Sequence, residues 1–188
     1  MSHFLTFFPV LLFSFVGLQL TQSAEKRPNI IFFLIDDLGW SDLGCYGSKY
    51  HLTPNIDKLA ARGIQFTNAY SASSVCSPTR SSVMTGKNPA RLGITDWIGA
   101  SQKYNILVTP KNVKALPQNE VTFAESLKES GYATAYFGKW HLGSDDKDHP
   151  SLQGFDYHRG VNRAGSPGSY YYPFKRNKTK SKRTLSAS

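Results

Sequence analysis

The chain has 188 residues, which is long enough for one domain with a buried core. Its hydrophobic content of 40% and aromatic content of 13% exclude an intrinsically disordered chain. The formal net charge is +9, but six positive charges lie within the last fourteen residues, which leaves +3 for the rest. These six residues are Lys175, Arg176, Lys178, Lys180, Lys182 and Arg183. Because most of the net charge lies in one tail without interleaved aromatic residues, we expect a solvated, poorly ordered end and no nucleic-acid partner.

An apolar leader opens the chain. Residues 4–20 are apolar with few interruptions, and small or polar residues follow at 21–24. This pattern predicts a secretory signal peptide over residues 1–24, removed after Ser23 or Ala24. The protein is then expected to be secreted or periplasmic, and lysosomal or extracellular in a eukaryote.

An uncleaved membrane anchor is the alternative interpretation of the leader, but it needs roughly 20 strongly apolar residues. The residues that dilute the apolar run are Ser14, Gly17, Gln19 and Thr21. We therefore expect no stable membrane anchor.

The chain has two cysteines, Cys45 and Cys76. In an exported protein they could form one disulfide, which is the simple structural interpretation. The residues around Cys76 favour a chemical role for it instead.

The first predicted elements are a strand, a helix and a second strand. Residues 29–35 form an apolar run without alternation, typical of a strand buried on both faces of a parallel sheet. Thr53 can cap a helix that begins at Pro54 and ends at Gly63. Its apolar stripe consists of Ile56, Leu59 and Ala60. Residues 64–70 are interpreted as a second strand.

A second helix is predicted directly after Cys76. Ser77 followed by Pro78 is typical of a capped helix start, and this helix is expected to run to about residues 85–86. Residues 87–119 have no clear period, so we expect a long surface loop with short elements.

A third helix and a third strand follow that loop. Thr122 and Glu125 have the spacing of a capping box, and the helix that they begin is expected to end at Gly131. Residues 132–137 are interpreted as a strand. No periodic element is expected beyond Gly160.

The order of these elements predicts an α/β fold with a mostly parallel sheet and helices on both faces. Ligands of such sheets bind beyond the carboxyl ends of the strands. Asp36 and Asp37 directly follow one predicted strand. Lys139 and His141 follow another, and Cys76 lies just before a helix. We therefore expect these three groups to meet at one edge of the sheet.

The acidic pair is a candidate metal site. Adjacent carboxylates such as Asp36 and Asp37 repel each other unless a cation lies between them, and hard divalent ions prefer oxygen ligands. A turn or helix-capping pair is an equally good interpretation of the spacing alone.

The remaining candidates suit an anionic ligand. A helix N-terminus at Cys76 favours a thiolate or a bound anion, and Arg80 one turn on can offer a bidentate fork to a sulfate or phosphate. Lys139 and His141 share one side in extended geometry and supply a charge and a proton donor. Taken singly, Cys76 is most simply an inert core thiol. Together with the acidic pair, these residues describe a metal-assisted site for the ester of a tetrahedral anion.

Residues 76–80 (Cys-Ser-Pro-Thr-Arg) match the Cys-x-Pro-x-Arg core of the signature of type I, formylglycine-dependent sulfatases, and residues 81–86 continue it. The other segments that resemble this family are residues 28–40, 53–57, 138–143 and 154–156. The resemblance implies the N-terminal part of an arylsulfatase-like catalytic domain over residues 27–160, with an alkaline-phosphatase-like fold. Residues 161–188 form a Gly/Tyr-rich and then basic tail.

The resemblance also implies a nucleophile and a metal. A formylglycine-generating enzyme converts Cys76 to formylglycine, whose hydrated aldehyde attacks the sulfur and later expels sulfate. Asp36 and Asp37, with the modified Cys76, bind a calcium ion that polarises the sulfate oxygens.

Three further roles follow from the same resemblance. Arg80 steadies the formylglycine, Lys139 contacts the sulfate oxygens, and His141 hydrogen-bonds the hydrated aldehyde. The substrate is expected to be a sulfate ester, either a sulfated sugar or an aryl sulfate.

The sequence departs from this family in its length. Members of the family are several hundred residues long, and their remaining metal ligands, with a further His and Lys, lie in the second half. The resemblance therefore implies a chain truncated before its second half, and inactive or nearly so by itself.

Two other functions stay open. A phosphatase or phosphodiesterase of the same superfamily usually carries Ser or Thr, with zinc, where Cys76 stands. A non-catalytic, truncated product could instead bind sulfated glycans through its basic tail.

Overall fold

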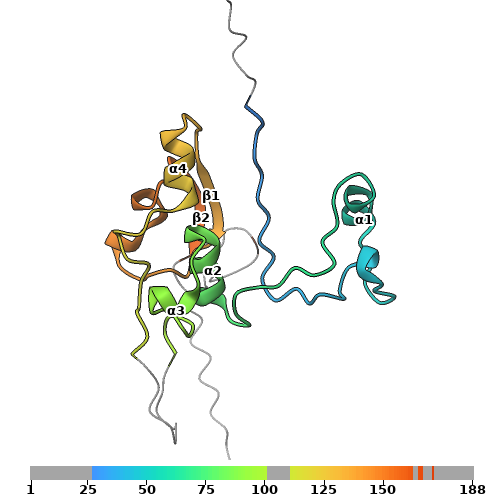
Figure 1. Cartoon of the computed structure of the whole chain (residues 1–188), viewed down its shortest axis with the longest axis horizontal. Coiled ribbons are helices and arrows are strands. Elements are labelled where there is room, and N and C mark those ends of the chain that lie inside the picture. The colour runs from blue at the N-terminus through green and yellow to red at the C-terminus, as the bar shows by residue number, and fades with distance from the viewer. Residues whose placement is uncertain (1–26, 101–110, 163–164, 167–170, 172–188) are drawn as a thin grey trace, which may run out of the picture. The chain divides into compact units, whose positions relative to one another are not determined.

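The computed structural model (Figure 1) describes residues 27–100, 111–162, 165–166 and 171. The predicted signal peptide at 1–24 and most of the basic tail lie outside these residues. Within the described part of the chain, none of the helices has the length and apolar character that crossing a bilayer demands.

The helices of the described chain are α1 (Pro54–Ala60), α2 (Cys76–Thr85), α3 (Pro89–Leu92) and α4 (Phe123–Glu129). The strands are β1 (Ala135–Lys139) and β2 (Tyr157–Asn162). Three single-turn 3-10 helices are η1 (Gly44–Tyr46), η2 (Asp146–Asp148) and η3 (Pro150–Leu152). The chain divides into two compact units, residues 1–35 and 36–188.

In the first unit, the predicted strand at 29–35 is wrong. The described residues of this unit adopt no strand, and their side chains are exposed, from 37% at Leu34 to 77% at Ile31 and Phe33. An apolar segment becomes a strand only through backbone hydrogen bonds to a neighbouring strand, and the described residues of this unit include no second segment to provide them.

In the second unit, helix α1 confirms the predicted helix and its proline start, but the capping prediction is wrong. Thr53 occupies the N-cap position, yet its hydroxyl donates to Asp57 Oδ1 at 2.9 Å and accepts from Gly44 N at 2.8 Å. The predicted apolar stripe is not buried, because Leu59 remains 63% exposed. The predicted strand at 64–70 is also wrong, since these residues are irregular and exposed.

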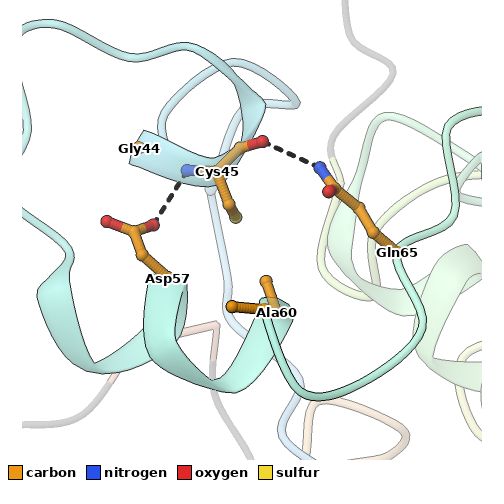
Figure 2. A pocket seen from close by; sticks show the side chains of 6 residues that line it. Gly44, Cys45, Asp57, Ala60 and Gln65 are labelled. Carbon is orange, nitrogen blue, oxygen red and sulfur yellow. Dashed lines mark hydrogen bonds between the residues drawn. The ribbon is translucent and has the colours of Figure 1, made fainter.

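Helix α1, the turn η1 and Gln65 line a shallow, open hollow of about 450 Å³ (Figure 2). Its walls are held by two hydrogen bonds of the Cys45 backbone. The Cys45 N–H donates to Asp57 Oδ1 at 2.8 Å, and the Cys45 carbonyl accepts from Gln65 Nε2 at 2.8 Å. Cys45 and Cys76 are both free thiols, so the disulfide interpretation is wrong.

Helices α2 and α4 lie where the sequence placed them. Helix α2 ends at Gly86, which takes the left-handed conformation at φ 67°. Helix α4 begins with the predicted capping box, in which Thr122 Oγ1 accepts from Glu125 N at 3.1 Å and Glu125 Oε2 accepts from Thr122 N at 2.7 Å. Ser77, by contrast, is the second residue of α2 and not its cap, because the N-cap is Val75.

The sheet consists of β1 and β2 in parallel, with Ala135 opposite Tyr157 and Lys139 opposite Asn162. Strand β1 lies later than the predicted 132–137, and β2 was missed. The register shifts between Phe137 and Lys139, at a position where Gly138 has φ 97°. A bulge of this kind turns the end of a strand and redirects the side chain that follows.

An apolar cluster packs between the elements of the second unit. Its buried members are Met84, Leu92, Ile94, Leu116, Ala124, Trp140, Leu142 and Phe155. Edge-to-face contacts extend it, with the Tyr136 ring 5.1 Å from both Trp140 and Phe155. Leu92, Ile94 and Leu116 come from the segment 87–119, so this segment is not only the predicted surface loop but also part of the core.

Candidate active site

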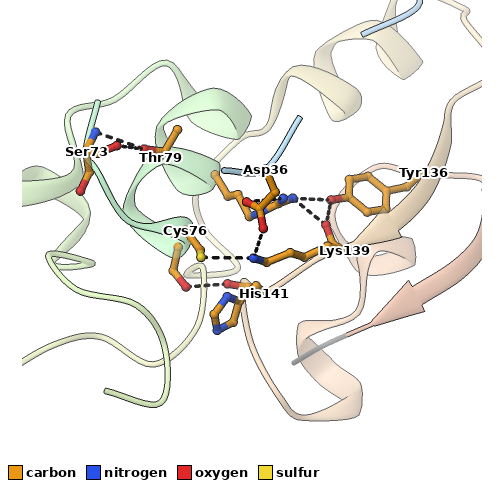
Figure 3. A network of polar contacts seen from close by, with 9 residues as sticks. Asp36, Ser73, Cys76, Thr79, Tyr136, Lys139 and His141 are labelled. Carbon is orange, nitrogen blue, oxygen red and sulfur yellow. Dashed lines mark hydrogen bonds and ion pairs between the residues drawn. The ribbon is translucent and has the colours of Figure 1, made fainter. Parts of the chain in front are cut away.

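Cys76 is the first residue of α2, so it lies beside the N–H groups of the first turn that have no partner within the helix. The approach to the helix is fixed by Thr79, whose hydroxyl donates to the Ser73 carbonyl at 2.7 Å and accepts from Ser73 N at 3.1 Å. The Cys76 side chain points toward Lys139, whose Nζ donates to Cys76 Sγ at 3.2 Å (Figure 3).

Arg80 lies one turn further along α2 and is buried, with its side chain 5% exposed. Its Nη1 donates to the Lys139 carbonyl at 2.6 Å and to the Tyr136 hydroxyl at 3.3 Å. Its Nη2 pairs with Asp36 Oδ1 at 3.3 Å. The Arg80 guanidinium, which the sequence suggested as a bidentate donor to an external oxyanion, therefore bonds to protein groups instead. Through these bonds Arg80 joins α2 to the end of β1.

The Lys139 ammonium bridges Cys76 and the Asp36 carboxylate (Figure 3). Burial lowers the pKa of Lys139, but the hydrogen bonds to Asp36 and Cys76 outweigh it and hold that pKa above its usual value. Burial raises the pKa of Asp36, but Lys139 and Arg80 outweigh it and hold that pKa below its usual value. Lys139 and Asp36 are therefore both charged at neutral pH.

His141 follows β1 with φ 54°, in the left-handed region, and is buried. Its ring packs 6.2 Å from Trp97, and its Nε2 lies 2.9 Å from the carbonyl of Ile98. Burial, together with the positive charges of Lys139 and Arg80, lowers the pKa of His141. The ring is thus neutral at physiological pH.

The structure brings four of the predicted site residues into direct contact: Asp36, Cys76, Arg80 and Lys139. His141 joins them through a neighbour, because the hydroxyl of Ser77 donates to the His141 carbonyl at 2.9 Å. Asp37 shares none of these contacts; it is exposed and has φ 57°.

The donors present do not complete a calcium site. Asp36 and Asp37 offer the oxygen ligands that calcium prefers, but this ion takes about 6–8 oxygens. Both oxygens of Asp36 already pair with Arg80 and Lys139. In the part of the chain that the structure describes, no three His, Cys, Asp or Glu side chains gather into a possible metal site.

Tyr136 is a site residue that the sequence did not identify. Its hydroxyl donates to the Lys139 carbonyl and accepts from Arg80, and burial raises the pKa of this phenol. A buried tyrosine normally finds a partner for its hydroxyl, but the sequence does not show which residue that is.

The chain shows similarity to sulfatases at the level of family, relatives and solved structures. The profile of the Sulfatase family matches residues 28–186. Arylsulfatase G of Rattus norvegicus is 41% identical over 172 residues, which are 88% of this chain and 31% of the relative. Steryl-sulfatase of Homo sapiens is 42% identical over 159 residues, which are 81% of this chain and 26% of the relative.

Two solved structures share the fold. A protein of glycosaminoglycan metabolism from Bacteroides thetaiotaomicron, BT33336S-sulf, aligns with a TM-score of 0.58 at 37% identity, over 73% of this chain and 28% of that one. BT4656, in complex with its substrate D-glucosamine-2-N,6-O-disulfate, aligns with a TM-score of 0.56 at 35% identity, over 71% of this chain and 23% of that one.

These comparisons confirm the predicted fold class, an α/β fold of the alkaline-phosphatase-like kind, to which the parallel pair β1–β2 and its helices conform. The chain spans about a third or less of the length of the relatives it matches. The family profile covers most of the chain, including every predicted site residue. The chain belongs to the sulfatase family.

Proposed function

We propose that this chain supplies the nucleophile and an anion-binding cation, Lys139, for the hydrolysis of a sulfate ester, with a formylglycine derived from Cys76. The contact of 3.2 Å between Lys139 Nζ and Cys76 Sγ carries the proposal. It places a charged hydrogen-bond donor at the side chain that reacts, on a helix N-terminus that also favours negative charge.

The position of Cys76 suits a formylglycine. An oxygen attached to the same carbon as the present sulfur would lie within reach of the Lys139 ammonium. When formed, a formylglycine supplies a hydrated aldehyde, one hydroxyl of which is a nucleophile and the other an internal route for sulfate release.

A formylglycine-generating enzyme is the proposed partner in maturation, acting before the chain folds. Pro78 and Arg80, the residues that such an enzyme is expected to recognise, are buried in the folded chain. Cys76 itself is only partly exposed. Conversion of the unfolded chain avoids both obstacles.

In this proposal Lys139 donates a hydrogen bond to a sulfate oxygen and neutralises charge that develops during the reaction. Arg80 does not contact the sulfate in this proposal but positions Lys139 and Asp36. Its guanidinium donates to the Lys139 carbonyl at 2.6 Å and to the Asp36 carboxylate at 3.3 Å. His141 forms a hydrogen bond with the hydroxyl groups at position 76. With one carboxylate and two cations, this cluster carries a net charge of about +1, which favours a sulfate monoester.

Calcium remains a proposed cofactor with an incomplete set of ligands here. Asp36 and Asp37, with the modified Cys76, would supply some of its oxygens, and Asp36 would have to exchange its pairing with Arg80 and Lys139. The chemistry that the ion would supply is polarisation of the sulfate oxygens.

The proposed substrate is a sulfate ester, either a sulfated sugar or an aryl sulfate. BT4656 is bound to a sulfated glucosamine, which supports the sugar class by similarity. Arylsulfatase G and steryl-sulfatase, as their names state, act on other sulfate esters. The apolar leader at 1–24 supports export to a secreted, periplasmic or lysosomal location.

The proposal is tested by the mass of one peptide. Trypsin cleaves after Arg62 and Arg80 and releases residues 63–80, which contain Cys76. In protein coexpressed with a formylglycine-generating enzyme, this peptide is expected to lose one sulfur and two hydrogens and to gain one oxygen. A Cys76→Ser protein is the matched control and should give a single unmodified mass.

Turnover supplies the second test. The converted chain and the Cys76→Ser control are incubated with 4-nitrophenyl sulfate and, separately, with 4-nitrophenyl phosphate. Release of nitrophenol from the sulfate by the converted chain, even at a low rate, and not by the Cys76→Ser control supports the proposal. An unmodified cysteine under all coexpression conditions, or a preference for the phosphate, contradicts it.

A further inference from the structure

We infer that Ser77 is a positioning residue for His141: its hydroxyl, with the Ile98 backbone, fixes His141 in the tautomer that leaves Nδ1 as a hydrogen-bond acceptor for a hydroxyl at position 76. The role of that acceptor rests on the proposed function. The positioning itself rests on contacts of buried groups and is testable without any turnover.

The Ser77 hydroxyl joins two segments that are distant in sequence. It donates to the His141 carbonyl at 2.9 Å and accepts from the Ile98 N–H at 2.9 Å. Ser77 has no exposed surface, so water does not compete for either bond. The Ser77 hydroxyl does not cap α2. It joins His141 to Ile98 instead.

Ile98, whose N–H is bonded to Ser77, also determines which ring nitrogen of His141 carries the hydrogen. His141 Nε2 is 2.9 Å from the Ile98 carbonyl, which can only accept a hydrogen bond. Nε2 therefore carries the hydrogen. In a neutral imidazole the other nitrogen, Nδ1, then has a free lone pair and acts as an acceptor.

His141 Nδ1 is buried and has no hydrogen-bond partner among the described residues. Burying an acceptor without a partner destabilises a folded protein, so such an atom indicates a group that the site is built to receive. The group must be a donor. The hydroxyls expected on a converted Cys76, the residue adjacent to Ser77, are donors of this kind.

Loss of the Ser77 hydroxyl leaves both the Ile98 N–H and the His141 carbonyl without their buried partner. The backbone at Ile98 then loses the bond that anchors its N–H side, and the Ile98 carbonyl, in the next peptide group, is no longer held where it selects Nε2 as the protonated nitrogen. The expected result is a mixture of tautomers, in which part of the population presents an N–H at Nδ1 and cannot accept.

The helix offers a matched control. Ser81 is also in α2 and has no exposed surface, but its hydroxyl donates only to the Pro78 carbonyl within the same helix. Ser81→Ala therefore removes a buried hydroxyl from α2 without touching Ile98 or His141.

The test is ¹⁵N NMR of the histidine rings in the full chain, with His141→Gln used to assign the His141 signals. The native protein is expected to show Nε2 protonated and Nδ1 unprotonated at neutral pH. Ser77→Ala is expected to move both signals toward the average of the two tautomers, and Ser81→Ala to leave them unchanged. A native signal with Nδ1 protonated, or native-like signals in Ser77→Ala, overturns the inference.

The native spectrum decides the tautomer even where Ser77→Ala fails to fold. Turnover of 4-nitrophenyl sulfate by formylglycine-bearing protein then tests the role of the acceptor. Ser77→Ala is expected to lower kcat on the order of tenfold to a hundredfold, with KM little changed. Unchanged kcat in the presence of mixed tautomers overturns the catalytic part of the inference. A Cys76 that stays unmodified on coexpression, or a preference for 4-nitrophenyl phosphate, contradicts the proposed function instead, and the spectra still decide the positioning of His141.

Discussion

The Lys139 ammonium lies 3.2 Å from the Cys76 sulfur while it also pairs with the Asp36 carboxylate. One cation is thus shared between the residue that is proposed to react and the carboxylate of Asp36. Its side chain is 13% exposed, so little water screens either interaction. This arrangement makes Lys139 the residue whose removal tests the site most directly.

Lys139→Met is expected to lower kcat/KM for 4-nitrophenyl sulfate by about 10²–10³-fold, the usual cost of removing one donor to a developing negative charge. The measurement uses formylglycine-bearing protein. Lys147→Met is the control, since Lys147 is 74% exposed and pairs only loosely with Asp145 at 3.8 Å. A loss that is equal in both variants would contradict a specific role for Lys139.

Tyr136→Phe is expected to destabilise the fold by about 1 kcal/mol, because it removes a hydroxyl but leaves the Lys139 carbonyl its bond from Arg80. Tyr136→Ala also removes the ring that packs against Trp140 and Phe155, and should cost about 3–5 kcal/mol. Urea denaturation measures both. Equal losses would show that the hydroxyl, and not the ring, supplies most of the stability.

Helices were predictable where short-range signals fix them. The capping box of α4 needs only Thr122 and Glu125, three residues apart, and the end of α2 needs only Gly86. Both were identified from the sequence. The acidic, cysteine and Lys/His groups were also expected together, and contacts among Asp36, Cys76 and Lys139 show that they meet.

The structural features that could not be predicted from the sequence depend on residues that are distant in the chain. Strand β2 pairs with β1 across 22 residues, and the segment 29–35 has no such partner among the described residues of its unit. The contact between Arg80 and Tyr136 joins residues 56 apart. No local sequence pattern identifies Tyr136 as a partner of Arg80, because the packing of the core brings these two residues together.

Acid is expected to weaken the junction between α4 and the start of β1. The hydrogen bond from Lys128 and those from the Thr134 N–H and hydroxyl hold the pKa of Asp156 below its usual value. A lowered folded-state pKa adds stability that is complete above the ordinary pKa of 3.8 and is lost as the pH falls through the folded value.

The free energy of unfolding, measured by urea denaturation between about pH 6 and about pH 2, should therefore fall less steeply in Asp156→Asn than in the native chain. Glu129→Gln, an exposed carboxylate at the end of α4, is the control. If both variants keep the native slope below about pH 4, Asp156 is not a source of the acid sensitivity.

Gly154 is a glycine whose replacement should damage the fold. It has φ 90°, and a Cβ there would lie 2.4 Å from the Glu125 backbone nitrogen, a distance that no side chain can keep. That nitrogen donates to Thr122 Oγ1 in the capping box, so it cannot move away without breaking the cap of α4. Gly160 also has a left-handed backbone, at φ 64°, but a Cβ there meets nothing within 4 Å.

Gly154→Ala and Gly160→Ala therefore share the backbone strain of about 1–2 kcal/mol and differ only in the collision with α4. Urea denaturation is expected to show Gly154→Ala less stable than Gly160→Ala by about 1–3 kcal/mol, the usual cost of overpacking. Equal stabilities would mean that the segment before β2 can shift away from α4 at no cost. The junction of α4 with the parallel pair would then be a loose contact, although Thr134 and Asp156 bond across its other side.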